Sequence, residues 1–258
     1  MHGMKFAGIR AFISGGASGL GHAVASRVMA GGGQVLLFDL NPVLGAAAAT
    51  EFGTRCHFVV GDVGDESAVE AAMASARTLF GGIDMAVCCA GIGTASRLLG
   101  RAGPMTTAFL RRMIEVNLVG TVLCARGAAA LMQANTPGPD GERGVIVMTA
   151  SIAAYEGQIG QVAYAASKGG IVAMTLPMAR ELASSGIRVV TIAPGIFQTP
   201  LLSALPEAAQ LSLGQQVPFP PRLGRPEEYA ALVEQVAGNT MLNGETIRLD
   251  GALRMAPR

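Results

Sequence analysis

Short, continuous apolar stretches alternate along this chain with longer alanine-rich segments. The stretch Val35–Phe38, for example, carries four apolar residues in a row. A strand with one face in water alternates apolar and polar residues, whereas a strand covered on both faces reads as a continuous apolar run. The repeated order of strand and helix therefore predicts an α/β fold, a doubly wound parallel sheet of about seven strands with helices on both faces.

The predicted elements fill the whole chain. Strands are expected at Ile9–Ser14, Gln34–Asp39, Cys56–Val60, Met85–Cys89, Val145–Thr149, Arg188–Pro194 and Thr246–Leu249. Helices are expected at Gly19–Gly31, Pro42–Glu51, Glu66–Leu79, Thr106–Gln133, Ala163–Ser184 and Pro226–Val236. The 258 residues suit a single domain spanning residues 1–258, because no Ser- or Pro-rich linker divides them. The segment Phe197–Leu223 follows a strand and interrupts the pattern, which is typical of a substrate loop.

Charge, hydropathy and cysteine content narrow the range of partners. The formal net charge of +1 argues against a nucleic-acid partner. The longest apolar runs, such as residues 86–93, are short and interrupted by glycine, so we expect no membrane span. Residues 1–16 lack a signal-sequence pattern, and the four cysteines (Cys56, Cys88, Cys89 and Cys124) lack metal-binding spacing. We interpret the cysteines as small buried residues and expect no metal and a reducing compartment, which is the cytoplasm, or the mitochondrial matrix if the source is eukaryotic.

A glycine-rich turn follows the first predicted strand. Residues 14–21 read SGGASGLG, with the spacing G-x-x-x-G-x-G at the start of a helix. Glycine permits a tight turn and lets backbone N–H groups approach a pyrophosphate at the helix N-terminus. We therefore expect a dinucleotide site of the Rossmann type that uses Gly15, Ser18, Gly19, Leu20 and Gly21. A glycine-rich turn without a ligand would have the same sequence.

Asp39 ends the second predicted strand, 18 residues after Gly21. At this spacing a carboxylate accepts hydrogen bonds from the adenosine ribose hydroxyls and repels a 2′-phosphate. Because no Lys or Arg stands at Ser18 or at Leu40–Asn41, the sequence favours NAD(H) over NADP(H). Asp62 and Val63 end the third strand and suit the edge and ring of adenine, although Asp62 suits a helix N-terminus nearly as well.

Tyr164 and Lys168 stand four residues apart in a predicted helix, so they share one helix face. Taken alone, this spacing is typical of a pair on the protein surface. In order along the chain, however, the glycine turn, Asp39, GDV at 61–63, CAG at 89–91, NLVGT at 117–121, Ser151 and the Tyr164–Lys168 pair resemble the short-chain dehydrogenase/reductase family. Segments 150–161, 167–180, 191–202, 216–224 and 242–252 are similar to its branch of type 10 17β-hydroxysteroid dehydrogenases, also called type II 3-hydroxyacyl-CoA dehydrogenases.

The resemblance implies a catalytic set within an NAD-dependent dehydrogenase. Tyr164 would be the general acid/base, and Lys168 would lower the pKa of its phenol and bind the nicotinamide ribose. Ser151 would hold the substrate oxygen, and Asn117 would anchor a water that links Lys168 to solvent. The hydride would pass between the alcohol carbon and the nicotinamide.

The resemblance also implies further cofactor contacts and one departure. Cys89, Ala90 and Gly91 would contact the adenosine ribose through the backbone, while Pro194, Phe197 and Thr199 would lie at the nicotinamide end. Many family members have N-N-A-G where this chain has C-C-A-G at 88–91. An asparagine that supports the central sheet would then be absent at Cys88, which puts local stability in question.

The substrate is less well specified. The substrate loop carries Leu201, Leu202, Leu205, Leu211, Leu213, Val217 and Phe219, which suit an acyl chain or a steroid but equally a lid packed on the core. Arg97 and Arg101 suit solvated surface positions better than contacts to CoA phosphates. The leading hypothesis is a 3-hydroxyacyl-CoA dehydrogenase with hydroxysteroid activity. The alternatives are a 3-oxoacyl-carrier-protein reductase and a non-catalytic cofactor-binding scaffold. The resemblance also implies a homotetramer formed through the two longest helices and the last strand.

Overall fold

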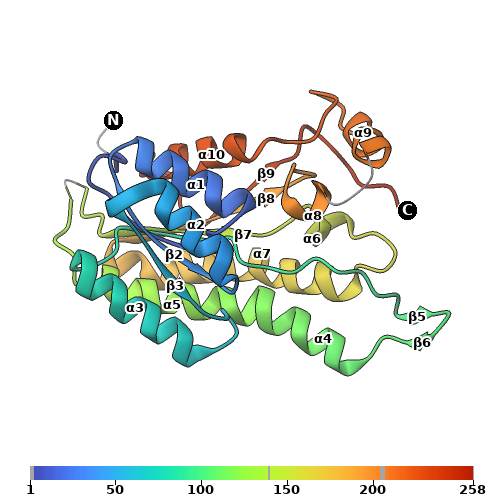
Figure 1. The fold of residues 1–258 in the computed structure, drawn as a ribbon, viewed down its shortest axis with the longest axis horizontal. Coiled ribbons are helices and arrows are strands. Elements are labelled where there is room, and N and C mark those ends of the chain that lie inside the picture. The colour runs from blue at the N-terminus through green and yellow to red at the C-terminus, as the bar shows by residue number, and fades with distance from the viewer. Residues whose placement is uncertain (1–2, 139, 204–206, 258) are drawn as a thin grey trace.

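The computed structural model describes residues 3–138, 140–203 and 207–257, and within them the chain forms one seven-stranded parallel sheet (Figure 1). The strand order is β3-β2-β1-β4-β7-β8-β9. These strands are β1 (Arg10–Ser14), β2 (Gln34–Asp39), β3 (Cys56–Val60), β4 (Met85–Cys88), β7 (Gly144–Thr149), β8 (Ile187–Pro194) and β9 (Thr246–Leu249). The order reverses between β1 and β4, and ligands of open α/β sheets bind at such a reversal, beyond the carboxyl ends of the strands.

Helices cover both faces of the sheet. Figure 1 shows α1 (Gly19–Ala30), α2 (Pro42–Phe52) and α10 (Pro226–Gly238) on one side. On the other side lie α3 (Glu66–Phe80), α4 (Thr107–Ile114), α5 (Gly120–Met132) and α7 (Val162–Leu182). The shorter elements are η1 (Gly53–Arg55), α6 (Ala153–Glu156), η3 (Ala183–Ser185), α8 (Pro200–Ser203), α9 (Glu207–Gln215) and the hairpin strands β5 (Leu99–Gly100) and β6 (Gly103–Pro104).

The core lies in two apolar layers, one on each face of the sheet. Successive residues of a strand point to opposite faces. Thus Phe12 belongs to the layer under α3 and α5, and its neighbour Ile13 belongs to the layer under α1 and α10. Both side chains are fully buried. This arrangement explains why the strands lack the alternation of apolar and polar residues.

The predicted elements are confirmed to within about two residues at most boundaries, which is the usual uncertainty of helix ends. The long helix expected at Thr106–Gln133 differs internally. It consists of α4, the π-helical segment η2 (Glu115–Val119) and α5. A π turn inserts one extra residue into a helix and turns the side chains around it, and here it carries Asn117.

One helix bears on the expectation that the chain has no membrane span, which stays a prediction. The helical run Thr107–Met132 is 26 residues long and is apolar enough, by length and composition, to cross a membrane. Half of its most apolar window is buried inside the fold. Buried residues of α5 such as Cys124 and Ala128 pack in the core layer with residues of α3 and β4, which is the environment of a core helix.

The predicted substrate loop 197–223 contains two short helices, α8 and α9. Residues 204–206, and with them Leu205, lie outside the described residues. The neighbouring hairpin β5–β6 extends away from the body of the molecule (Figure 1). Both segments follow carboxyl ends of strands, so they border the side of the sheet where a ligand is expected.

Candidate active site

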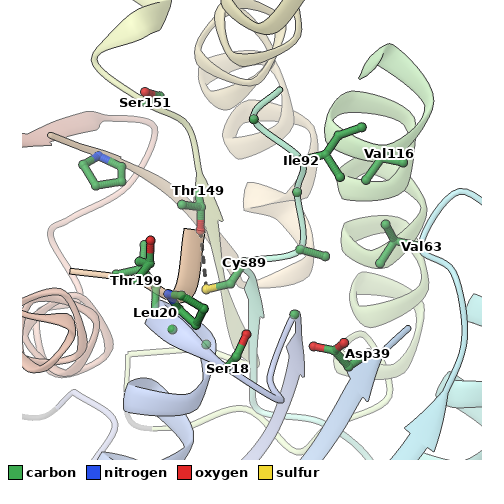
Figure 2. Close-up of a pocket in the computed structure, with 18 of the residues that line it drawn as sticks. Ser18, Leu20, Asp39, Val63, Cys89, Ile92, Val116, Thr149, Ser151 and Thr199 are labelled. Atoms are coloured by element: carbon green, nitrogen blue, oxygen red, sulfur yellow. Dashed lines mark hydrogen bonds between the residues drawn. The ribbon is translucent and has the colours of Figure 1, made fainter. Parts of the chain in front are cut away.

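A cleft of about 500 Å³ lies beyond the carboxyl ends of the strands (Figure 2). Nearly all the residues predicted from the sequence line it. They are Gly15, Ser18, Gly19, Leu20, Gly21, Asp39, Asp62, Val63, Cys89, Ala90, Gly91, Ser151, Tyr164, Lys168, Pro194, Phe197 and Thr199. Asn117 is the predicted residue that does not line the cleft. The fold thus gathers residues from segments spread over most of the sequence into one site.

The glycine turn between β1 and α1 fits a phosphate group. Gly15 and Gly19 have φ angles of +66° and +55°, a conformation that glycine adopts without strain. A Cβ atom at Gly21 would lie 2.3 Å from the carbonyl oxygen of Gly15, so the helix packs directly on the turn. Ser18 does not cap α1 with its side chain, and the first turn of α1 contains no acidic residue. The N-terminus of α1 is therefore suited to an anion.

Asp39 is held at the end of β2 by two backbone groups. Its Oδ2 accepts a hydrogen bond from the N–H of Ala17 at 3.1 Å, and its Oδ1 accepts one from Asn41 at 3.0 Å. Among the described residues that line the cleft, the cations are Lys168 and Arg112, and neither is adjacent to Asp39 in the sequence. The site therefore fits ribose hydroxyls and disfavours a 2′-phosphate.

Asp62, which the sequence predicts to face adenine, lines the cleft, and the structure adds a partner that the sequence did not indicate. Its Oδ1 accepts a hydrogen bond from the N–H of Gly64 at 2.9 Å, and its Oδ2 accepts one from Arg112 at 2.6 Å. Burial raises the pKa of Asp62, but the Gly64 and Arg112 hydrogen bonds outweigh it and lower the pKa overall. Arg112 and Val116 both line the cleft, and no local motif in the sequence marks either residue.

Tyr164, Lys168 and Ser151 converge where α7 begins beside the end of β7. The Lys168 Nζ lies 5.9 Å from the centroid of the Tyr164 ring and donates a hydrogen bond of 2.8 Å to the carbonyl oxygen of Thr149. The Oγ of Ser151 accepts a hydrogen bond from the N–H of Ala153 at 3.1 Å. Figure 2 shows Ser151 and Thr149 on the segment that leaves β7 at the edge of the cleft.

Burial dominates the electrostatics of this group. Burial raises the pKa of Tyr164, and a hydrogen bond with Ser151 partly opposes that rise. The expected lowering of the Tyr164 pKa by the Lys168 charge stays a prediction. Burial in turn lowers the pKa of Lys168 to about 8, against opposing effects of Cys89 and Cys88. The hydrogen bond from Ser151 is thus one contact that lowers the pKa of the phenol.

Asn117 is fully buried behind the cleft. Its Oδ1 accepts a hydrogen bond from the N–H of Ile92 at 2.8 Å, and its Nδ2 donates to the Ile92 carbonyl at 2.9 Å and to the Ser167 Oγ at 3.0 Å. The Ser167 hydroxyl donates in turn to the carbonyl of Tyr164 at 2.7 Å. Asn117 therefore links the segment after β4 to the first turn of α7. Its role in holding a water stays a prediction.

The two adjacent cysteines are accommodated by the fold. Cys88 is 2% exposed and belongs to a core layer. The Sγ of Cys89 lies 3.6 Å from the Thr149 hydroxyl (Figure 2) and 3.8 Å from the hydroxyl of Tyr229, and these two hydroxyls are 2.7 Å apart. In the described part of the chain, every buried side-chain nitrogen and oxygen has a hydrogen-bond partner. The cysteine at position 88, where many family members have asparagine, therefore leaves no buried polar side-chain group of the described residues unpaired.

The predicted substrate residues divide into three groups. Leu202 lines the cleft, together with Phe197 and Thr199. Val217 instead packs with Ile152 and Leu253 in a small separate cluster. Leu211 and Phe219 are exposed, and Arg97 and Arg101 are exposed and do not line the cleft.

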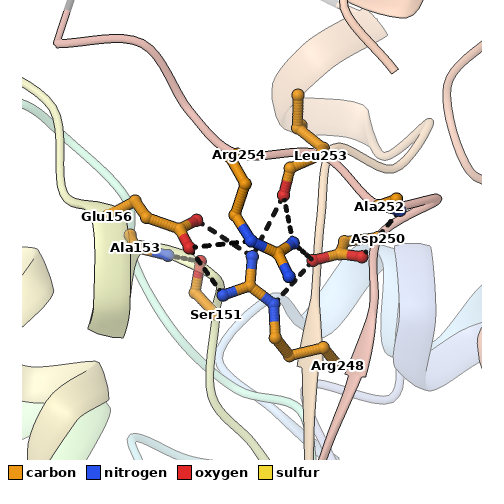
Figure 3. A network of polar contacts seen from close by, with 8 residues as sticks. All are labelled: Ser151, Ala153, Glu156, Arg248, Asp250, Ala252, Leu253 and Arg254. Atoms are coloured by element: carbon orange, nitrogen blue, oxygen red, sulfur yellow. Dashed lines mark hydrogen bonds and ion pairs between the residues drawn. The ribbon is translucent and has the colours of Figure 1, made fainter. Parts of the chain in front are cut away.

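An ion-pair network lies directly behind Ser151 (Figure 3). Arg248 of β9 binds both carboxylate oxygens of Glu156, at 2.7 and 2.9 Å, and the carboxylate of Asp250 at 2.7 Å. It also donates to the carbonyl of Leu253 at 3.0 Å. Because Glu156 ends α6, the network joins the helix after Ser151 to β9 and to the C-terminal segment.

Comparison with known proteins gives matches over nearly the whole chain. Residues 10–210 match the family model described as short chain dehydrogenase. The 3-hydroxyacyl-CoA dehydrogenase type-2 of Bos taurus is 52% identical over 252 residues, which are 97% of this chain and 97% of that protein.

Two solved structures are similar as well. The 3-hydroxyacyl-CoA dehydrogenase type-2 from Mycobacterium avium has a TM-score of 0.93 at 44% identity, covering 97% of this chain and 98% of that chain. The 3-ketoacyl-(acyl-carrier-protein) reductase from Brucella melitensis, complexed with NADH, has a TM-score of 0.86 at 28% identity, covering 97% of this chain and 100% of that chain.

Proposed function

Because the chain belongs to the short-chain dehydrogenase family, we propose that it oxidises the 3-hydroxyl group of a short 3-hydroxyacyl-CoA thioester. It is an NAD-dependent oxidoreductase that acts on a small-molecule substrate. The observation that carries the proposal is that Ser151, Tyr164 and Lys168 lie in the same cleft as the glycine turn. The similarity to type-2 3-hydroxyacyl-CoA dehydrogenases supports the substrate class.

In the proposed reaction, Tyr164 accepts the proton of the substrate hydroxyl as general base. Ser151 donates a hydrogen bond to the same oxygen and so fixes its position. Because burial raises the pKa of Tyr164, its phenolate needs stabilisation, which Lys168 would supply by its nearby positive charge while the Ser151 hydroxyl is bonded to the substrate oxygen. Bound NAD⁺ supplies the hydride acceptor.

The cofactor would be held along the whole cleft. The N-terminus of α1 would bind the pyrophosphate, Asp39 the adenosine ribose and Asp62 the adenine. Pro194, Phe197 and Thr199 would border the nicotinamide, and Lys168 would bond its ribose. Cys89, Ala90 and Gly91 would border the adenosine ribose.

A substrate panel tests the proposal. The purified chain would be assayed for NADH formation with NAD⁺ and 3-hydroxybutyryl-CoA, a long-chain 3-hydroxyacyl-CoA, a steroid alcohol and a simple secondary alcohol. We expect the highest kcat/KM for the short thioester and measurable but lower values for the steroid. A steroid or simple alcohol preferred over every thioester would contradict the proposed substrate class.

A second candidate function is reduction of 3-oxoacyl groups on a carrier protein, favoured by the similarity to the Brucella reductase. Such reductases normally prefer NADPH, which the carboxylate of Asp39 disfavours. The same assay run in reverse with acetoacetyl-CoA and acetoacetyl-carrier protein separates the two. A higher kcat/KM for the carrier-protein substrate would support the second function.

The setting of the enzyme is part of the proposal. We propose a homotetramer that works in the cytoplasm, or in the mitochondrial matrix of a eukaryote. All four cysteines are free thiols, which supports a reducing compartment.

A further inference from the structure

Arg112 reaches into the cofactor cleft from a helix remote from it in sequence. It stands in the last turn of α4, and its partner Asp62 lies 50 residues earlier, after β3. The two side chains are about one-half and one-quarter exposed, at 49% and 28%. Both residues line the cleft. The ion pair is therefore part of the wall of the site.

The contacts fix the orientation of the Asp62 carboxylate. One oxygen accepts the N–H of Gly64 at 2.9 Å, and the other accepts Arg112 at 2.6 Å. A carboxylate oxygen accepts more than one hydrogen bond, so each oxygen keeps a lone pair for a ligand. With one donor on each oxygen, the carboxylate cannot rotate without breaking a hydrogen bond. Without Arg112, only the local contact to Gly64 would orient it.

We infer that Arg112 is a positioning residue that makes the cofactor site selective for adenine, by holding the Asp62 carboxylate toward the 6-amino group of the base. The inference rests on the proposed binding of adenine at Asp62. The adenine 6-amino group donates hydrogen bonds to a carboxylate. Hypoxanthine carries a 6-oxo group, which only accepts and is repelled by it. The loss of an oriented acceptor should therefore weaken binding of the adenine dinucleotide more than binding of its hypoxanthine analogue.

The helix offers a matched control. Arg111 precedes Arg112, is also exposed, stands in the same last turn of α4 and does not line the cleft. Both arginines occupy neighbouring positions of the same continuous helical run, Thr107–Met132, so removing either has a similar effect on the helix itself. A difference between the two variants then reports the contact with Asp62.

Binding is measured without turnover, through the increase in nicotinamide fluorescence when NADH or reduced nicotinamide hypoxanthine dinucleotide is added. The readout is the ratio of the two dissociation constants. We expect Arg112→Ala to lower the preference for adenine about tenfold, since charge-assisted hydrogen bonds are the strong ones. Arg112→Lys should restore part of the preference, and Arg111→Ala should leave it unchanged.

Two outcomes would overturn the inference. If Arg112→Ala raises the dissociation constants of both dinucleotides by the same factor, Arg112 contributes to binding but not to selectivity between the two bases. If the wild-type chain binds the adenine and hypoxanthine dinucleotides equally well, Asp62 does not distinguish a 6-amino from a 6-oxo group. Either result leaves the proposed dehydrogenase activity standing, because that activity is measured separately with 3-hydroxybutyryl-CoA. A chain that prefers adenine through Arg112 but oxidises no thioester would instead refute only the proposed substrate.

Discussion

Lys168 is a buried cation whose surroundings oppose its charge. Its side chain is 5% exposed, and burial lowers its pKa from the ordinary 10.5 to about 8. The ammonium keeps one strong hydrogen bond, to the carbonyl of Thr149 at 2.8 Å. At neutral pH the protonated form therefore costs free energy in the folded state, which a cofactor hydroxyl would partly offset.

We predict a dependence of stability on pH from this residue. Between about pH 8 and pH 10.5 the folded chain has released the Lys168 proton while the unfolded chain still binds it. The free energy of unfolding then rises with pH across this window, by about 3 kcal/mol in total. Urea unfolding of the wild type and of Lys168→Met near pH 7 and pH 10 measures this rise as the difference between the two proteins. A difference that does not change with pH would contradict the lowered pKa.

Tyr164 carries the proton transfer in the proposed reaction. We predict that Tyr164→Phe lowers kcat by about 10² to 10⁴, the usual contribution of a general acid or base, because the ring stays but the proton acceptor is lost. The dissociation constant of NADH should change little, which fluorescence titration checks. Tyr155→Phe is the control, since Tyr155 is 48% exposed and its ring packs under Arg248 at 5.2 Å. If Tyr164→Phe keeps full turnover, another group moves the proton.

At the scale of elements, short connections carry the site and tertiary contacts hold them. Ser151 lies between β7 and α6, and α6 is only four residues long. A helix this short does not form independently. Arg248 of β9 binds Glu156 at the end of α6. The buried Ile152, just before α6, packs against Leu253 and Val217. The position of the serine therefore depends on residues about 100 positions later in the chain, since Glu156 and Arg248 are 92 residues apart.

Removing Arg248 tests this arrangement. Arg248→Met leaves the carboxylates of Glu156 and Asp250 with only the longer contacts to Arg254, at 3.4 and 3.3 Å, so we predict a loss of about 2 kcal/mol in the free energy of unfolding and a lower kcat. Arg126→Met is the control, because its pair with Glu66 is more than half exposed on both sides and should contribute little to stability. Chemical denaturation and steady-state kinetics measure both effects. Equal losses in the two variants would show that the network holds nothing in place.

The close packing of the glycine turn against α1 leads to a second prediction at the scale of elements. Gly21→Ala would place a Cβ 2.3 Å from the Gly15 carbonyl oxygen, so the turn or the helix must move. We predict a loss of about 1–3 kcal/mol in stability and weaker NADH binding. Gly169→Ala is the control, because its Cβ meets nothing within 4 Å inside α7 and should stabilise the helix by about 0.5–1 kcal/mol. Calorimetric melting and NADH titration distinguish the two, and a stable Gly21→Ala variant with normal affinity would contradict the prediction.

At the scale of the whole molecule, some apolar side chains on the helices that cover the sheet are exposed to solvent. Val122 on α5 is 38% exposed and Leu176 on α7 is 43% exposed. These are the two longest predicted helices, through which the proposed tetramer would form. Burial of such side chains between chains would add to the stability of the assembly.

We predict that light scattering after gel filtration gives a mass four times that of one chain. Leu176→Asp should reduce this mass, because it would bury a charge in the interface. Val43→Asp is the control, since Val43 is 74% exposed on α2, away from those helices. A monomer at all concentrations would contradict the tetramer, and loss of the assembly in the Val43 variant alone would place the interface elsewhere.

The sequence by itself determined the class of fold, the position of the strands and most of the cleft. Continuous apolar runs specify strands buried on both faces, and β2, β3 and β9 have the bounds expected. The glycine turn and Asp39 were also predictable, because their spacing reflects local backbone geometry at the end of a strand. The Tyr164–Lys168 pair was recognisable only in the company of the other motifs.

Only the tertiary structure decided which residues meet across long separations. Arg112 pairs with Asp62, and Arg248 with Glu156, although nothing local in the sequence marks either pair. The same holds for the pKa of Tyr164, which depends on how deeply the phenol is buried and on its hydrogen bond with Ser151. Local spacing fixes turns and helix faces, because these involve neighbouring residues. Burial and ion pairs depend on how whole elements pack, and that is settled only when the chain folds.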